Sequence, residues 1–100
     1  MSYVLSRDAV EDLIQIWRYI KRQSTAEMAD RVETAIRAKF VILAETPGAG
    51  HIRKNLTEED VRFFTVYSYL IVYRPQDKPL RIVSILHGSR DVARVLKTRL

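Results

Sequence analysis

The spacing of apolar residues changes near the middle of the chain, and this change most strongly limits the fold. Between residues 7 and 44 apolar side chains recur every three or four positions, as on one face of an α-helix. From residue 61 onward they form short runs rich in β-branched and aromatic residues, as strands do. A chain of 100 residues has room for one hydrophobic core. The two halves are therefore expected to pack as layers of a single domain over residues 1–100.

The first half is predicted to form one short strand and two helices. The strand spans residues 3–5, and Ser6 is a candidate N-cap for a helix over residues 7–22. Ser24 is the first residue of a capping-box pattern that opens a second helix, which ends at the Pro-Gly pair 47–48. Because only two or three residues separate the helices, they are expected to form an antiparallel hairpin.

The second half is predicted to form three strands and a last helix. A loop over residues 46–60 precedes them, and Ser89 is a candidate cap for a helix over residues 90–99. The run 70–73 is apolar without alternation, as a central strand covered on both faces would be. The predicted strands span residues 61–67, 69–74 and 80–87. The order β-α-α-β-β-β-α predicts an α+β fold, with the helical hairpin packed on a small, mainly antiparallel sheet.

Positive charge is concentrated in the last two-fifths of the chain. Residues 1–60 hold nine Lys and Arg against ten Asp and Glu, a net charge of −1. Residues 61–100 hold eight against two, a net charge of +6. Such asymmetry favours an acidic partner for this half, either nucleic acid or an acidic protein surface. The alternative is a basic face that only contacts solvent.

The composition excludes several kinds of site. The chain has no cysteine, which rules out disulfides, thiolate zinc sites and cysteine nucleophiles. No carboxylates stand at metal-site spacing, so we expect neither a metal nor another cofactor. The N-terminal segment lacks the pattern of a signal peptide, and no apolar run is long enough to span a membrane. A cytoplasmic protein is expected.

Several segments together resemble the ParE/RelE toxin superfamily, on its ParE or plasmid-stabilisation side. In the second half these are LAETPGAGHIR, VRFFTVYSYLIVYRP and LRIVSILHGSRDVARVL. In the two predicted helices they are LSRDAVEDLIQIWRYI and ADRVETAIRAKFVILAETP. Each segment is moderately specific, whereas their order and spacing are strongly so. The resemblance covers essentially the whole chain, and the predicted order of elements agrees with the fold of that family.

The resemblance implies a growth-inhibiting toxin that a co-expressed, ParD-like antitoxin holds inactive in a hetero-oligomer. ParE-like members poison DNA gyrase, whereas RelE-like members cleave mRNA on the ribosome. The first implies a binding protein without catalytic residues, and the second an endoribonuclease. A toxin fold that has lost its toxicity and binds only the antitoxin is a third hypothesis. None of these implies a membrane partner, or sequence-specific DNA binding by this chain alone.

The nuclease hypothesis selects one histidine and three arginines. A metal-independent ribonuclease needs an acid, a base and cations around the scissile phosphate. A late histidine or tyrosine is catalytic in some RelE-like relatives, so the resemblance implicates His87, whose alternative role is to order its turn. His51 is a weaker candidate because it follows a Gly-rich segment that it could simply pin. Arg62, Arg74 and Arg81 lie on successive predicted strands, where they would form a phosphate site if the register aligns them.

The last helix is expected to carry a cationic contact surface for the target or the antitoxin. Arg90, Arg94 and Lys97 recur at i, i+4 and i+7, which places them on one helical face. The alternative for Lys97 and for Arg99 is a favourable interaction with the negative end of the helix dipole.

The helical hairpin is expected to bind the antitoxin. Both helices have apolar faces wider than the ~100° stripe that a helix packed on a sheet requires. Packing of each helix on its neighbour as well as on the sheet accounts for most of the excess. Val10, Ile14 and Trp17 lie at one margin of the first helix, and Phe40 lies at a margin of the second. These four residues are predicted to border a groove for an amphipathic antitoxin helix.

Overall fold

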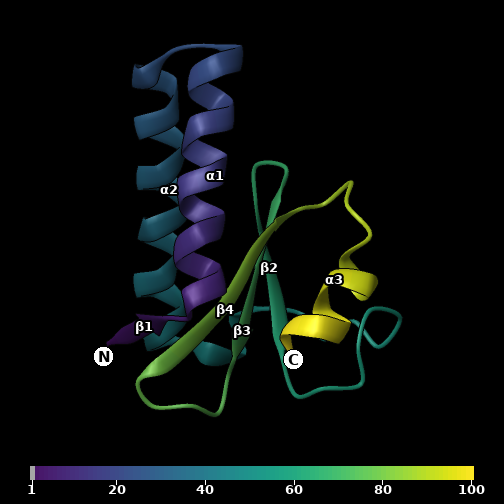
Figure 1. The fold of residues 1–100 in the computed structure, drawn as a ribbon. Helices are drawn as coiled ribbons and strands as arrows, with labels where there is room; N and C mark the ends of the chain where they lie inside the picture. Colours follow the sequence, from purple (N-terminus) through teal and green to yellow (C-terminus); the bar gives the residue numbers. More distant parts are fainter. Residues whose placement is uncertain (1) are drawn as a thin grey trace.

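A computed structural model describes residues 2–100, which form a mixed four-stranded sheet with helices on both faces (Figure 1). In chain order the elements are β1 (Tyr3–Leu5), α1 (Arg7–Gln23), α2 (Ala26–Glu45), the 3-10 helix η1 (Pro47–Ala49), β2 (Arg62–Val66), β3 (Tyr69–Arg74), β4 (Leu80–His87) and α3 (Val92–Arg99). The strand order is β1-β4-β3-β2, in which only β1 runs parallel to its neighbour. The predicted α+β fold and its element order are confirmed.

The helix starts are set by side-chain caps, and two predicted caps are wrong. The Ser6 hydroxyl accepts from the backbone N–H of Ala9 at 3.0 Å, which confirms Ser6 as the N-cap of α1. Thr25, not Ser24, caps α2, because its hydroxyl accepts from Met28 N–H at 3.0 Å. The backbone of Ser24 instead completes α1. Asp91, not Ser89, caps α3, which therefore starts at Val92 rather than at residue 90.

The sheet has an apolar cluster on each face, and β3 contributes to both. Ile71 and Tyr73 pack with the helical hairpin, whereas Leu70 and Val72 pack on the side of α3. All four side chains are buried, which confirms the prediction of a central strand covered on both faces. Figure 1 shows the hairpin and α3 on either side of the sheet.

Side chains at the start of α1 hydrogen-bond to backbone groups of β4 that β1 leaves unpaired. The pairing between β1 and β4 involves only Leu80–Ile82 on β4. Beyond it, the Ser6 hydroxyl donates to the carbonyl of Val83 at 2.7 Å. The carboxylate of Asp12 accepts from the backbone N–H of Ile85 at 2.9 Å. These bonds fix α1 along the sheet edge.

The loop after α2 is held by a buried tyrosine. The Tyr73 hydroxyl donates to the carbonyl of Pro47 at 2.6 Å and accepts from the N–H of Gly50 at 2.8 Å. Burial raises the pKa of Tyr73, so its phenol is neutral at physiological pH. Gly50 is required here, because an added Cβ would lie 2.5 Å from that hydroxyl. His51 then bridges to Phe63 through its backbone, which ties the loop to β2.

Candidate functional site

A shallow groove runs along the outer surface of the hairpin, between α1 and α2. Its volume is about 330 Å³. Val10 and Ile14 lie one helical turn apart on α1 and are 44% and 40% exposed, whereas Leu13 beneath them is buried. We call this the hairpin groove, and its lining residues are Val10, Leu13, Ile14, Trp17, Arg18, Glu33 and Arg37.

The indole of Trp17 has a fixed position at one end of the hairpin groove. Its Nε1–H donates to the carboxylate of Asp30 on α2 at 2.8 Å. The ammonium of Lys21 lies 5.4 Å from the ring centroid, within cation–π range. The ring is therefore held by polar contacts that leave it only partly buried.

Phe40 does not lie on this surface, so its predicted place at the groove is wrong. Its side chain is 0% exposed. The ring packs on Tyr3 of β1 with a centroid separation of 5.3 Å. Phe40 turns inward because it follows Val32 and Ile36 at helical spacing on the face of α2 that meets the sheet.

The cations of the last helix do not form one stripe. Arg90 precedes the helix, in the turn between β4 and the Asp91 cap. It lines a cleft between α1 and the sheet, whereas Lys97 lines a separate hollow beside the loop around Leu56. Arg94 and Lys97 remain exposed on α3 itself, one turn apart. The predicted three-residue stripe is wrong because Arg90 lies outside the helix.

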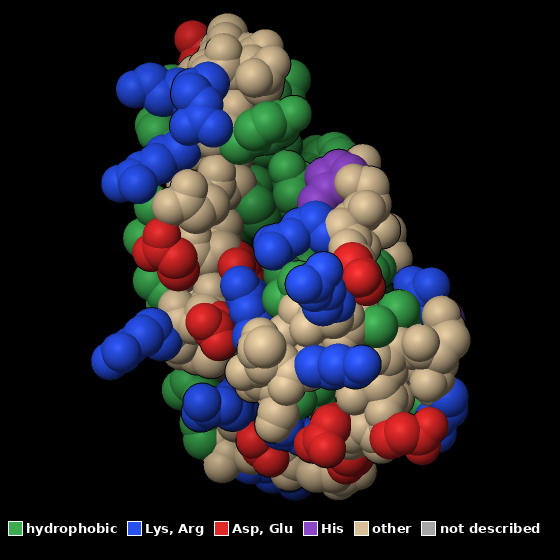
Figure 2. Space-filling model, turned by 45° about the vertical axis from the view of Figure 1, so that its right-hand side comes forward, with side chains coloured by type: hydrophobic (Ala, Val, Ile, Leu, Met, Phe, Trp, Pro, Cys, Tyr) green, Lys and Arg blue, Asp and Glu red, His purple; other side chains and the backbone are tan. Residues whose placement is uncertain are grey.

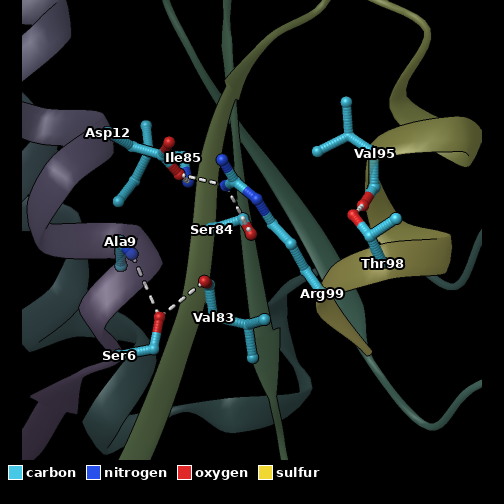
Figure 3. A network of polar contacts seen from close by, with 9 residues as sticks. All are labelled: Ser6, Ala9, Asp12, Val83, Ser84, Ile85, Val95, Thr98 and Arg99. Atoms are coloured by element: carbon cyan, nitrogen blue, oxygen red, sulfur yellow. Dashed lines mark hydrogen bonds and ion pairs between the residues drawn. The ribbon is translucent and has the colours of Figure 1, made fainter.

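Helix α3 is tied to α1 through a largely buried ion pair that was not predicted from the sequence (Figure 3). Nη1 of Arg99 donates to Oδ2 of Asp12 at 2.7 Å and to the Ser84 hydroxyl at 3.1 Å. The hydrogen bond with Asp12 raises the pKa of Arg99, which keeps the guanidinium charged. We call the contact of these three residues the Asp12–Arg99 clasp. Its sequence signal is a carboxylate at position 12 within the apolar face of α1, beside Ala9 and Leu13.

The four residues of the nuclease hypothesis are dispersed. Arg74 and Arg81 are direct partners across β3 and β4, but Arg62 pairs with Tyr73 and so lies on the opposite face of the sheet. Arg62 donates to the carbonyl of Gly50 at 2.9 Å. His87 is six residues along β4 from Arg81, a distance of about 20 Å. The register therefore does not align the three arginines, which is the condition that a shared phosphate site required.

His87 orders the turn that follows β4. Its Nδ1 accepts from the backbone N–H of Ser89 at 3.0 Å and lies 2.7 Å from the Ser89 hydroxyl. Accepting from an N–H requires a lone pair, so the turn occupies this nitrogen. The ring meets Tyr69 edge-on, with centroids 5.4 Å apart.

A larger cleft separates α1 from the end of β4. Its volume is about 680 Å³, and we call it the central cleft. Figure 2 shows it as a hollow beside the helical column, with hydrophobic side chains on its floor and cationic side chains at its rim. Burial and the nearby Tyr19 raise the pKa of Tyr69, one of the lining residues. The lining residues are Glu11, Asp12, Gln15, Ile16, Tyr19, Arg22, Tyr69, Ile85, His87, Ser89, Arg90 and Arg99.

Neither a metal-binding cluster nor a membrane-spanning helix occurs in the described part of the chain. Residues 2–100 contain no group of three or more His, Cys, Asp or Glu side chains placed to hold a metal ion. No helix within the same residues has the length and apolar character needed to cross a membrane.

The chain is a small α+β domain of order β-α-α-β-β-β-α with a groove on its helical hairpin, and comparison with known proteins identifies its family. Residues 3–92 match the sequence model of the ParE toxin of the type II toxin–antitoxin system parDE. The chain belongs to this family, which confirms the resemblance seen in the sequence. Toxin ParE1 of Caulobacter vibrioides is 32% identical over 89 residues, which cover 89% of this chain and 91% of that protein.

A solved structure has the same fold. The match is a chain of the chromosomal ParDE TA system from P. aeruginosa, with a TM-score of 0.73 and 23% sequence identity. It covers 87% of this chain and 95% of that one.

Proposed function

We propose that this chain inhibits DNA gyrase and that a ParD-like antitoxin neutralises it by laying an amphipathic helix in the hairpin groove. Membership of the ParE family supports both parts. The observation that carries the second part is the exposure of Val10 and Ile14 beside Trp17. Gyrase as the target would place the toxin and its antitoxin in the cytoplasm, as a hetero-oligomer.

The chemistry of the hairpin groove fits a helix better than an extended peptide. Apolar side chains at i, i+4 and i+7 on α1 form a strip that matches the a/d-type face of a partner helix. Charged side chains of both signs stand at the margins, in Arg18, Glu33 and Arg37. An apolar centre with a charged margin is the usual composition of a specific interface.

A charge placed in the groove tests the antitoxin site. Trp17→Glu should weaken binding of the co-expressed ParD-like antitoxin at least tenfold, because it replaces the indole of the apolar strip with a carboxylate that a docked helix would have to desolvate. Tyr19→Glu is the matched control, since Tyr19 is an exposed aromatic residue of the same helix that lines the central cleft instead. Titration calorimetry provides the measurement, with circular dichroism to verify folding. Equal losses in both variants, or none in either, would remove the groove from the proposal.

The dispersal of the nuclease residues supports gyrase inhibition over mRNA cleavage. Acid–base catalysis requires groups within hydrogen-bond reach of one substrate, and His87 is about 20 Å from Arg81 on the same strand. His87→Ala should therefore leave growth inhibition largely intact. If that variant folds but is no longer toxic, the RelE-like ribonuclease becomes the better hypothesis.

The response of cells to the induced toxin distinguishes the two targets directly. An SOS response with gyrase–DNA cleavage complexes is expected. Rapid cleavage of mRNA within codons would instead support the ribosome-dependent interferase. No growth arrest by a folded, antitoxin-binding chain would support the hypothesis that toxicity has been lost.

The exposed cations near α3 are the proposed contact with the target. Arg94 and Lys97 lie on the opposite side of the sheet from the hairpin, so the chain could engage target and antitoxin through different surfaces. Arg94→Glu should reduce growth inhibition without changing antitoxin affinity. Arg31→Glu, at an exposed position on α2, is the control for the change in net charge. Equal toxicity of the two variants would remove α3 from the target surface.

A further inference from the structure

The central cleft has two chemically different ends. Toward the start of α1 it is lined by Glu11 and Gln15, whose side chains hydrogen-bond to each other at 2.8 Å. Toward the end of α1 it is lined by aromatic and cationic side chains, which we call the aromatic end. Its members are Tyr19, Arg22, Tyr69, His87 and Arg90.

The two guanidinium groups of the aromatic end stand on different walls. Arg22 comes from α1 and Arg90 from the turn after β4. Neither forms an ion pair within the part of the chain that the structure describes, whereas Arg37, Arg74 and Arg99 do. Both are exposed at the rim, so both are available to an anion that enters the cleft.

Aromatic side chains line the same end of the cleft as these two cations. The side chain of Tyr19 is 51% exposed, so its ring is accessible to a ligand in the cleft. His87 and Tyr69 meet edge to face, and this contact fixes the histidine ring at the cleft. The contacts of Ser89 with Nδ1 also hold this ring. The aromatic end therefore has ring faces that are positioned before any ligand binds.

We propose that the aromatic end of the central cleft binds an unpaired nucleotide of single-stranded DNA or RNA. The base stacks on Tyr19 and His87, and the flanking phosphates contact Arg22 and Arg90. Single-strand sites combine stacking platforms with backbone cations in this way. The cleft volume of about 680 Å³ lies within the range of roughly 300–1,000 Å³ typical of small-ligand sites.

Two other ligands fit the aromatic end less well. A DNA duplex keeps its bases stacked, so it offers phosphates to the rim but nothing to the rings in the cleft. An acidic peptide would use the two arginines but gains little from the aromatic faces. The proposal goes beyond gyrase inhibition and does not depend on it, because the ligand class follows from the cleft alone.

Binding of short oligonucleotides to the full chain tests the proposal. Fluorescence anisotropy should show tighter binding of a labelled twelve-nucleotide oligothymidine than of a duplex of the same length. Tyr19→Leu should weaken single-strand binding about tenfold, equivalent to about 1.4 kcal/mol, and leave duplex binding unchanged. The control Trp17→Leu removes a ring from the opposite side of the same helix, in the hairpin groove.

Charge variants distinguish the aromatic end from general attraction to a basic protein. Arg22→Ala should weaken single-strand binding more than Arg18→Ala, which removes the same charge from α1 at the hairpin groove. Oligouridine in place of oligothymidine shows whether RNA or DNA is preferred, and specific binding of either supports the proposal. Equal effects of the two arginine variants, equal affinity for the duplex, or full competition by polyglutamate would overturn it.

Discussion

The two faces of the sheet are covered in different ways. The hairpin covers its face with two long helices that bury large apolar side chains, among them Ile36, Phe40 and Leu43. Helix α3 has eight residues and buries only Val92 and Leu96 against the other face. Isolated helices of this length are unstable in water, so α3 depends on what holds it to the sheet.

This difference separates the two proposed working surfaces. The hairpin groove is lined by residues of α1 and α2 alone, and α3 contributes nothing to it. The target cations and Arg90, by contrast, depend on the position of α3 and its preceding turn, which the Asp12–Arg99 clasp secures. Disrupting the Asp12–Arg99 clasp should therefore perturb the proposed target surface more than the proposed antitoxin surface.

The largest expected effect is on the hairpin face. Phe40→Ala should lower the free energy of unfolding by about 4 kcal/mol, because it leaves a cavity beside Tyr3 in the apolar cluster of the hairpin face. Urea denaturation provides the measurement. The control Val41→Ala, at the neighbouring exposed position, should change stability by no more than about 0.5 kcal/mol. Similar losses in both variants would contradict the placement of α2.

The next effect is on the clasp. Asp12→Ala should destabilise the fold by about 2 kcal/mol, because it removes the partner of Arg99 and leaves the N–H of Ile85 without an acceptor. Hydrogen exchange should accelerate in α3 more than in α2, while antitoxin affinity is retained. Glu11→Ala, at the adjacent exposed position, is the control. Unchanged protection of α3 would show that its apolar contacts suffice.

The parts of the fold that could be predicted from sequence are those encoded locally. Apolar periodicity within each segment placed the helices and strands to within about two residues of the observed ends. The caps were harder, because Ser24 and Thr25 are both good caps and only the end of α1 decides between them. A helical wheel also predicted the exposed strip of Val10, Ile14 and Trp17. The same wheel placed Phe40 at the margin of the apolar face of α2 and could not show that its side chain is buried in the core.

The parts that could not be predicted depend on contacts between distant residues. An irregularity between Val72 and Tyr73 shifts the register of β3 and β4, so that Arg74 faces Arg81. No local pattern reveals that shift. Similarly, Arg99 binds the carboxylate of Asp12, 87 positions away in the sequence. A cation in the last turn of a helix is already accounted for by the helix dipole, so the sequence gives no reason to expect this partner. The central cleft likewise combines α1 with residues of β3, β4 and the turn before α3.

Removal of the N-caps of α2 and α3 should cause smaller losses of stability, one on each face of the sheet. Thr25→Ala should lower the free energy of unfolding by about 1 kcal/mol, because α2 is part of the cooperative core. Asp91→Ala should cost about 0.5 kcal/mol, since its bond to the N–H of Arg94 is longer, at 3.3 Å. Ser24→Ala is the control that the sequence alone would have chosen for the larger effect. A greater loss in that variant than in Thr25→Ala would contradict the observed cap.

The smallest expected effect is a pH dependence confined to the hairpin face. Burial raises the pKa of Tyr73 above its ordinary value of 10.0, so the folded state keeps a proton that the unfolded state loses. The resulting stability is fully present below pH 10 and is lost as the pH rises through the folded pKa. Arg99, whose pKa is raised by Asp12, stays charged over this interval, so the clasp should not weaken with it.

The variant Tyr73→Phe should therefore lose less stability than the parent protein as the pH rises. It should also be less stable at neutral pH, because the carbonyl of Pro47 and the N–H of Gly50 lose their hydrogen-bond partner. Some slope should remain, since burial also raises the pKa of Tyr69. Urea denaturation between pH 8 and pH 11 provides the measurement. If the free energy of unfolding falls equally steeply with pH in both proteins, the Tyr73 hydroxyl does not lose its proton on unfolding. The alkaline loss of stability could then not be assigned to Tyr73 on the hairpin face.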